Sequence, residues 1–132
     1  MSELVCYARL VRYTDSQLVI ETVTRALADG FCHVKLHEIT ADAVREARIA
    51  AGDNVEITLD VNCPRTVREA LDMSAKLRPF NLRWLEEPIR PPERFDGLAR
   101  MRRESEIPMA APCQRSATAS CKTPGVSCCQ YV

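Results

Sequence analysis

Residues 55–88 read VEITLDVNCPRTVREALDMSAKLRPFNLRWLEEP and contain a complete strand–helix–strand unit. Val55–Val61 is a short apolar run with β-branched residues, which is typical of a strand. Thr66 and Glu69 have the spacing of a helix-capping box, and apolar residues at helical spacing follow them. Leu82–Glu86 is a second strand-like run. The stretch therefore predicts two strands joined by one helix.

The same unit recurs on both sides of this stretch. Further strands are predicted over Leu4–Tyr13, Cys32–Glu38 and Ile107–Ala111. Further helices are predicted to begin at Thr14 (with Gln17 at capping-box spacing), near Thr40, and at Pro91 and Pro92. Strands thus begin about every 25 residues with one helix in each gap, which indicates a parallel sheet, because parallel neighbours need a crossover.

Two folds satisfy this pattern: a doubly wound open sheet and a (βα)8 barrel of roughly 250 residues. No glycine-rich phosphate loop follows the first predicted strand, which disfavours a dinucleotide-binding sheet. The predicted fold class is therefore α/β, a partial TIM (βα)8 barrel of about four and a half βα units with parallel strands. Residues 1–111 are its N-terminal half in this interpretation.

The composition excludes several classes of partner. The chain has 132 residues, with 18 Lys and Arg against 18 Asp and Glu, and this balance gives no electrostatic argument for nucleic acid or an anionic membrane. No apolar run approaches the roughly 20 residues of a membrane span, and the start lacks the basic and apolar regions of a signal peptide. We expect a cytoplasmic protein that binds neither nucleic acid nor a membrane.

Residues 112–132 differ from the rest of the chain. They hold two charged residues, Arg115 and Lys122, no acidic residue, and four of the seven cysteines. No cysteine pair has C-x-x-C spacing and no histidine lies nearby, so a zinc site is disfavoured, and a disulfide framework needs a secreted context. The segment is interpreted as an irregular Cys-rich tail. It is either a flexible tail or a non-native end, such as a shifted reading frame or a misjudged gene boundary, and the non-native end is preferred.

Polar side chains stand at the ends of three consecutive predicted strands. Lys35 and His37 share one face of their strand, as do Asp60 and Asn62, and Glu86 ends the next strand. Active sites of parallel βα folds gather at the carboxyl ends of the strands. Asp60 and Glu86 there offer oxygen ligands to Mg²⁺. The cation would lower the pKa of Lys35 toward that of a base, and His37 is a second base or an orienting group.

Each residue also has a simpler interpretation. Asp60 is compatible with capping the helix that follows it, Glu87 and Pro88 with a solvated loop, and Lys35 with a side chain that extends from the helix layer to water. Three polar strand ends in three consecutive units nevertheless favour the functional interpretation.

The strings Val34-Lys35-Leu36-His37, Leu59-Asp60-Val61-Asn62 and Trp84-Leu85-Glu86-Glu87-Pro88, together with Ile107-Pro108-Met109-Ala110-Ala111, resemble the enolase superfamily in its mandelate racemase/muconate-lactonising branch. The resemblance runs from about residue 4 to residue 111. It implies a Mg²⁺-dependent barrel enzyme, usually homo-oligomeric, that removes the proton α to the carboxylate of a small substrate such as a sugar acid. It assigns Asp60 and Glu86 to the metal, Lys35 to proton transfer, and Asn62 to the substrate.

The chain departs from the family pattern at two quoted positions. His37 replaces the second lysine of a K-x-K pair, and Ala110-Ala111-Pro112-Cys113 stands where a third metal carboxylate is expected. We therefore expect a sugar-acid dehydratase or a racemase-like enzyme that is inactive as this chain, with dehydration preferred. The alternatives are a non-catalytic truncated product or pseudoenzyme, and an unrelated barrel aldolase in which Lys35 forms a Schiff base.

Overall fold

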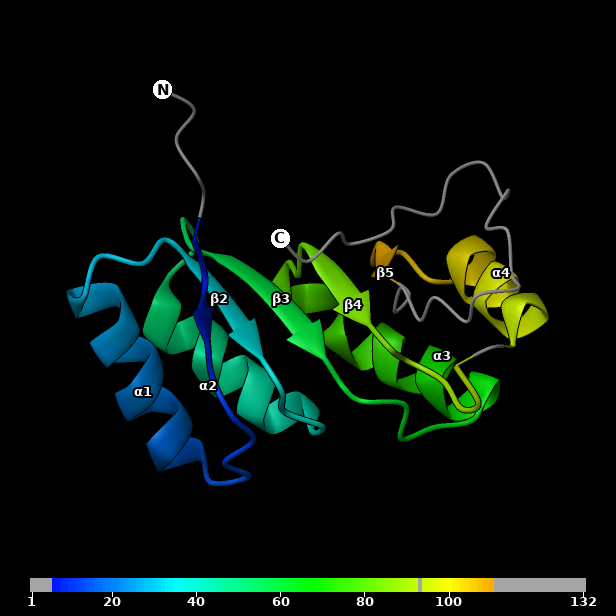
Figure 1. Cartoon of the computed structure of the whole chain (residues 1–132), viewed down its shortest axis with the longest axis horizontal. Coiled ribbons are helices and arrows are strands. Elements are labelled where there is room, and N and C mark those ends of the chain that lie inside the picture. The colour runs from blue at the N-terminus through cyan, green and yellow to red at the C-terminus, as the bar shows by residue number, and fades with distance from the viewer. Residues whose placement is uncertain (1–5, 93, 111–132) are drawn as a thin grey trace, which may run out of the picture.

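The computed structural model describes residues 6–92 and 94–110 (Figure 1). Its elements are β1 (Ala8–Arg9), α1 (Ser16–Ala28), β2 (His33–Leu36), α2 (Ala41–Ala51), β3 (Glu56–Asp60), α3 (Val67–Leu77), a 3₁₀ turn η1 (Arg78–Phe80), β4 (Trp84–Glu86), α4 (Phe95–Glu104) and β5 (Met109–Ala110). The predicted irregular tail over 112–132 lies outside the described residues.

The strands form one parallel sheet in the order β1-β2-β3-β4-β5, so each strand pairs with its neighbour in the sequence (Figure 1). Helix α1 packs against α2, α2 against α3, and α3 against α4. Successive helices can touch in this way only when they cover the same face of the sheet, whereas a doubly wound sheet places helices on both faces. The predicted α/β fold with the connectivity of a partial (βα)8 barrel is confirmed.

Alternation along the strands separates a core from a polar face. Val34, Leu36, Ile57, Leu59 and Leu85 are almost fully buried and pack with apolar residues of the helices. Residues of opposite parity, among them Lys35, Asp60 and Glu86, point to the other face of the sheet. The hydrophobic core therefore lies between sheet and helices, and the inner face is left for polar side chains.

Helix starts follow local capping chemistry. Thr66 and Glu69 form the predicted capping box at α3: the Thr66 side chain accepts from the Glu69 backbone N–H, and the Glu69 carboxylate accepts from the Thr66 backbone N–H. The predicted cap of α1 is wrong by one residue. Asp15 is the N-cap, and its Oδ1 accepts from two backbone N–H groups of the first turn, whereas Thr14 has a left-handed φ of 58°.

Two other predicted boundaries are also wrong. Helix α4 begins at Phe95 and not at the prolines, because Pro91 and Pro92 lie in the turn that precedes it. Phe95 is 67% exposed, whereas Met101 of the same helix is fully buried. Within the described residues β1 pairs at Ala8–Arg9, and Leu10 N–H also donates to Lys35 O, whereas the Arg12 side chain reaches the ends of β2 and β3.

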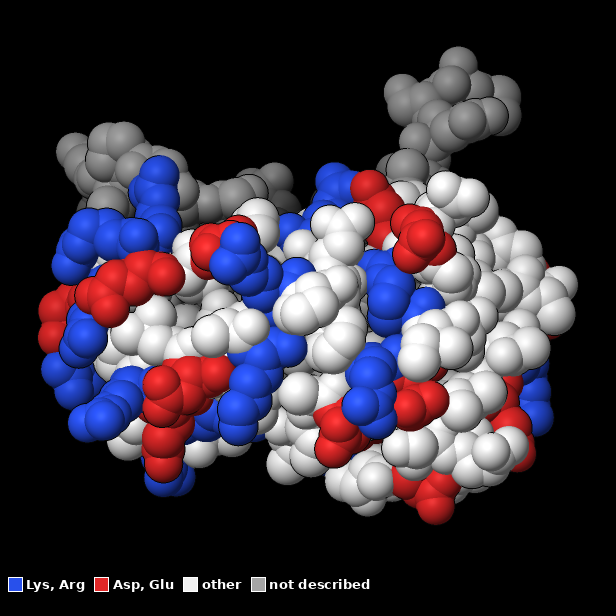
Figure 2. Space-filling model, turned by 180° about the vertical axis from the view of Figure 1, so that it is seen from behind, with Lys and Arg blue, Asp and Glu red and all other residues white. Residues whose placement is uncertain are grey.

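Charges of both signs are mixed on the face shown in Figure 2, and neither sign covers it continuously. In the part of the chain that the structure describes, no helix has both the length and the apolar character needed to cross a membrane.

Candidate active site

The register of the sheet brings the predicted site residues to one edge. Asp60 pairs with Glu86, which in turn pairs with Ala110, and Lys35 pairs with Thr58 one layer deeper. His37 directly follows β2 and reaches the level of Asp60. We call Lys35, His37, Asp60 and Glu86 the strand-end cluster. All four side chains are buried, although each is polar or charged.

Lys35 stands between the two carboxylates. Its Nζ lies 3.0 Å from Oδ2 of Asp60 and 2.8 Å from Oε2 of Glu86, to which it donates a hydrogen bond. The two carboxylates, on adjacent strands, thus point toward one positive atom. Buried charges are tolerated only when they are paired in this manner.

The same contacts set the charge of Lys35. Burial by itself lowers the pKa of the ammonium, but the hydrogen bonds and negative charges of Glu86 and Asp60 outweigh burial and raise the pKa above its ordinary value. The expectation of a lowered pKa concerned a lysine beside a divalent cation, and these ion pairs act in the opposite direction. A charged amine neither attacks a carbonyl nor takes a proton, so Schiff-base chemistry and general-base chemistry both require Lys35 to lose this proton first.

His37 has two different ring nitrogens. Nδ1 lies 2.6 Å from the carbonyl oxygen of Leu10. Nε2 is buried and has no hydrogen-bond partner, and it lies 3.4 Å from Oδ2 of Asp60. That separation satisfies an ion pair if the ring is protonated, but it is not an aligned hydrogen bond. Nε2 therefore faces Asp60 and can still donate or accept a hydrogen bond.

Asn62 fixes the orientation of Asp60. Both the backbone N–H and the Nδ2 of Asn62 donate to Oδ1 of Asp60, at 3.1 and 3.0 Å, which leaves Oδ2 facing Lys35. Asn62 and Cys63 after β3, and Glu87 after β4, all have positive φ angles near 50°. Such backbone strain in residues other than glycine is often found at functional sites. The loops are joined because Cys63 N–H donates to Glu87 O at 2.8 Å.

Two residues at this edge had no signal in the sequence. Arg12, after β1, donates from Nε to the carbonyl oxygen of His37 and from Nη2 to Oδ1 of Asn62, at 2.8 and 3.3 Å. Glu38, only 1% exposed, accepts hydrogen bonds from the backbone N–H groups of Tyr13 and Thr14. Both contacts join segments about 25 or more residues apart in the sequence, so no local pattern marks them.

The strand-end cluster suits a hard divalent cation in part. Mg²⁺ is commonly held by one or two carboxylates together with water and substrate oxygens, and Asp60 and Glu86 supply two that face one point. Ala110, at the register position next to Glu86, has no ligating side chain. Within residues 6–92 and 94–110, no set of three or more His, Cys, Asp and Glu side chains is arranged to hold a metal ion. The described residues therefore fit as two ligands and not as a complete set.

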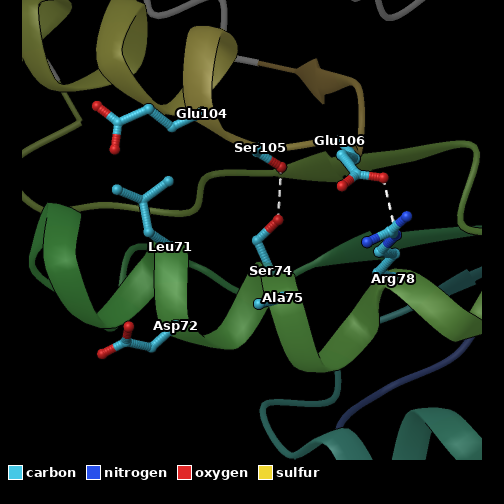
Figure 3. A pocket seen from close by; sticks show the side chains of 8 residues that line it. All are labelled: Leu71, Asp72, Ser74, Ala75, Arg78, Glu104, Ser105 and Glu106. Carbon is cyan, nitrogen blue, oxygen red and sulfur yellow. Dashed lines mark hydrogen bonds and ion pairs between the residues drawn. The ribbon is translucent and has the colours of Figure 1, made fainter.

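A surface pocket lies away from the strand ends, between α3 and the connection from α4 to β5 (Figure 3). Its hydroxyl groups, on Ser74 and Ser105, bond to each other, and the ion pair between Arg78 and Glu106 at its rim is exposed. No buried polar group without a partner points into this pocket among the described residues. It offers no chemistry comparable to that of the strand-end cluster.

Several known proteins are similar to this chain in sequence and in fold. D-galactarolactone cycloisomerase from Agrobacterium fabrum is 33% identical over 88 residues, which cover 63% of this chain and 23% of that protein. The solved 3,6-anhydro-D-galactonate cycloisomerase from Zobellia galactanivorans superposes with a TM-score of 0.74 at 25% identity, over 83% of this chain and 32% of that one. A racemase from Streptomyces coelicolor A3(2), solved with bound magnesium, gives 0.68 at 30% identity, over 80% and 31%. The chain spans about a quarter of the length of the curated relative.

The model of the family described as "Enolase C-terminal domain-like" matches residues 18–118. That range holds every residue of the strand-end cluster and extends beyond the predicted domain boundary at residue 111, which stays a prediction. The resemblance to the enolase superfamily is confirmed, and the chain belongs to the enolase C-terminal domain-like family.

Proposed function

We propose that the strand-end cluster is part of a Mg²⁺-assisted site that removes the proton α to the carboxylate of a small sugar acid. The observation that carries this proposal is the convergence of Asp60 and Glu86 on one point, where Nζ of Lys35 lies, with His37 beside Asp60. A divalent cation bound there would stabilise the negative charge that develops on the substrate carboxylate. The presence of magnesium in the related racemase supports this choice of metal.

The residues divide into three roles in this proposal. Asp60 and Glu86 would hold the cation, and Asn62 would keep Oδ2 of Asp60 directed toward it. Asn62 is also assigned to binding the substrate. Lys35 would take the α proton as a neutral amine, after a cation bound between the two carboxylates had displaced the ammonium and its proton had passed to water. His37 offers Nε2 as the second proton-transfer group.

Several outcomes can follow removal of the proton. The sequence favoured dehydration, because His37 takes the place of the second lysine. The relatives are named as cycloisomerases and a racemase, which supports an isomerisation instead. Proton removal α to a carboxylate is the step that the family resemblance implies for all of them, so the proposal is made for this step.

The 132-residue chain by itself is expected to bind Mg²⁺ weakly and to turn over no sugar acid. Its described part offers two carboxylates to a cation, and the matched segment covers 23% of the length of the galactarolactone cycloisomerase. With less negative charge at the site, Mg²⁺ gives up hydration water reluctantly.

The test measures exchange of the α proton of galactonate and galactarate in D₂O with Mg²⁺, by proton NMR. The chain alone is compared with a chimera in which it replaces the matching segment of the galactarolactone cycloisomerase. We expect exchange only from the chimera, and its loss in Lys35→Met but not in Lys76→Met, a change at an exposed lysine of α3. A chimera that folds and binds Mg²⁺ yet shows no exchange would contradict the proposal. Borohydride trapping of Lys35 with a carbonyl compound would favour the aldolase alternative.

A further inference from the structure

Arg12 lies at the same edge as the strand-end cluster, in the segment between β1 and α1. Its Nε and Nη2 atoms donate to the His37 carbonyl and to Oδ1 of Asn62, and Nη2 has a longer contact of 3.5 Å with the Val61 carbonyl. Asn62 in turn donates to Asp60. The guanidinium thus stands two hydrogen bonds away from a carboxylate of the cluster, and its side chain is exposed to solvent.

The charge of Arg12 has no counter-ion in the described structure. Some exposed arginines pair with carboxylates, as Arg78 does with Glu106 and Arg100 with Glu104, whereas Arg25, Arg68 and Arg103 form no ion pair within the described residues. What distinguishes Arg12 from these three is its place beside the strand-end cluster. Arg12 bonds only neutral oxygens, and no carboxylate within residues 6–92 and 94–110 forms an ion pair with it. A guanidinium has five N–H donors in a planar fork, so Arg12 keeps donors for an anion.

The segment that carries Arg12 is held in place by Glu38. Both carboxylate oxygens of Glu38 accept hydrogen bonds from this segment, from Tyr13 N–H at 2.7 Å and from Thr14 N–H at 3.2 Å. Glu38 is almost completely buried, and its neighbour His37 bonds the Leu10 carbonyl. Arg12 therefore sits between two anchor points, and little ordering is needed when a ligand binds.

A second guanidinium adds to the positive potential. Burial lowers the pKa of Arg65, Glu69 raises it, and the charge of Arg12 lowers it further, so the two arginines act on each other electrostatically. Arg65 donates to the carbonyl oxygen of Ile39, close to Glu38 in the sequence. Two neighbouring cations, neither ion-paired within the described residues, favour an anion at this edge.

We infer that Arg12 binds a second anionic group of the substrate, so that the site takes dicarboxylic sugar acids in preference to monocarboxylic ones. This inference rests on the proposed function, in which the first carboxylate lies at the cation between Asp60 and Glu86. Arg12 is offset from that position by the Asn62 side chain. A carboxylate at the far end of the same molecule is then the group that can accept its N–H donors.

The test measures binding of galactarate, with two carboxylates, and galactonate, with one, by isothermal titration calorimetry in Mg²⁺, with the chimera that contains the full 132-residue chain. The symmetrical dianion has a statistical advantage of about two, and charge-assisted hydrogen bonds are expected to raise its preference to about tenfold or more. Arg12→Gln should remove that preference and leave galactonate binding within about twofold. Arg12→Lys should retain part of it. Arg103→Ala, at an exposed arginine of α4, should leave both affinities unchanged.

The outcomes separate this inference from the function on which it rests. Mg²⁺-dependent binding of galactonate with no added preference for galactarate, or a preference that survives in Arg12→Gln, would overturn the role of Arg12 alone. Absence of Mg²⁺-dependent binding of both acids would overturn the inference and the proposed function together. Thermal melting of each variant, read by circular dichroism, identifies a variant that fails to fold, and then Arg12→Lys decides the question.

Discussion

His37 Nδ1 lies 2.6 Å from the carbonyl oxygen of Leu10. A carbonyl oxygen only accepts hydrogen bonds, so Nδ1 carries a hydrogen and the neutral ring keeps its lone pair on Nε2. This contact joins the segment after β1 to the end of β2. It sets both the tautomer of the histidine and the direction of the nitrogen that faces Asp60.

The first prediction follows from this contact. Two-dimensional ¹H–¹⁵N NMR of the histidine rings should show His37 as the Nδ1–H tautomer whenever it is neutral. His37→Asn can keep a donor near the Nδ1 position, so its free energy of unfolding should fall by about 1 kcal/mol. His37→Gln loses that donor, so its free energy of unfolding should fall further. Urea denaturation measures both. An Nε2–H tautomer for neutral His37 would contradict the assignment.

The second prediction concerns Lys35. Lys35→Met leaves two buried carboxylates that repel each other, and the free energy of unfolding at neutral pH should fall by about 3–5 kcal/mol. Mg²⁺ should raise the melting temperature of Lys35→Met more than that of the unchanged chain, because the cation no longer competes with the ammonium. Calorimetric melting with and without Mg²⁺ checks both statements.

The matched control for this experiment is Lys76→Met, at an exposed position of α3, which should change neither stability nor the response to Mg²⁺. If Lys35→Met does not fold, the double change Lys35→Met with Glu86→Gln removes one of the two repelling charges and should fold. Equal stabilisation of all variants by Mg²⁺ would show that the ion binds elsewhere.

The third prediction concerns Arg48 in α2, a buried arginine that bonds backbone carbonyls only. Its guanidinium donates to the carbonyl oxygens of Gly52, Val55, Phe80 and Asn81 at 2.7–3.1 Å. Lysine cannot reproduce this planar fork, so Arg48→Lys should lower the free energy of unfolding by about 2–3 kcal/mol. The same change at Arg45, which is exposed on the same helix, should cost less than about 0.5 kcal/mol. Urea denaturation that gives equal values for the two variants would contradict this role.

The fourth prediction concerns the capping box of α3. Hydrogen bonds from the backbone and side chain of Thr66 lower the pKa of Glu69 below its ordinary value, with small further contributions from Arg90 and Arg65. A lowered pKa in the folded state means that ionised Glu69 stabilises the fold above the ordinary pKa of a glutamate. That contribution is lost as the pH falls through the lowered pKa.

Thr66→Ala removes the side-chain hydrogen bonds but keeps the backbone N–H, so the pKa of Glu69 should rise only part of the way back. The lost cap itself should cost about 1 kcal/mol. NMR titration of the Glu69 side chain and urea denaturation measure the two effects. Thr40→Ala, which removes the N-cap of α2, should cost a similar amount without moving the pKa of Glu69. A shift of that pKa in Thr40→Ala would show that it reports general loosening.

Local sequence patterns predicted the elements of the fold. Contacts within a few residues set three features of the fold. They are the alternation of buried and inner-face side chains along β3 and β4, the capping box at Thr66, and the single helix in each gap between strands. The same alternation placed Lys35, Asp60 and Glu86 on one face, because carboxyl ends of parallel strands meet at one edge. The catalytic and metal-binding roles of these residues remain predictions.

Tertiary contacts decided the rest. The cap of α1 moved from Thr14 to Asp15 because Glu38 binds the Thr14 backbone N–H from another strand–helix unit. Helix α4 begins at Phe95 because Pro91 and Pro92 lie in the turn before it. Arg12 reaches the strand-end cluster through His37 and Asn62, which lie 25 and 50 residues later in the chain. Sequence alone therefore determined which residues stand at the strand ends. Hydrogen bonds between segments far apart in the sequence decided which further residues contact the strand-end cluster.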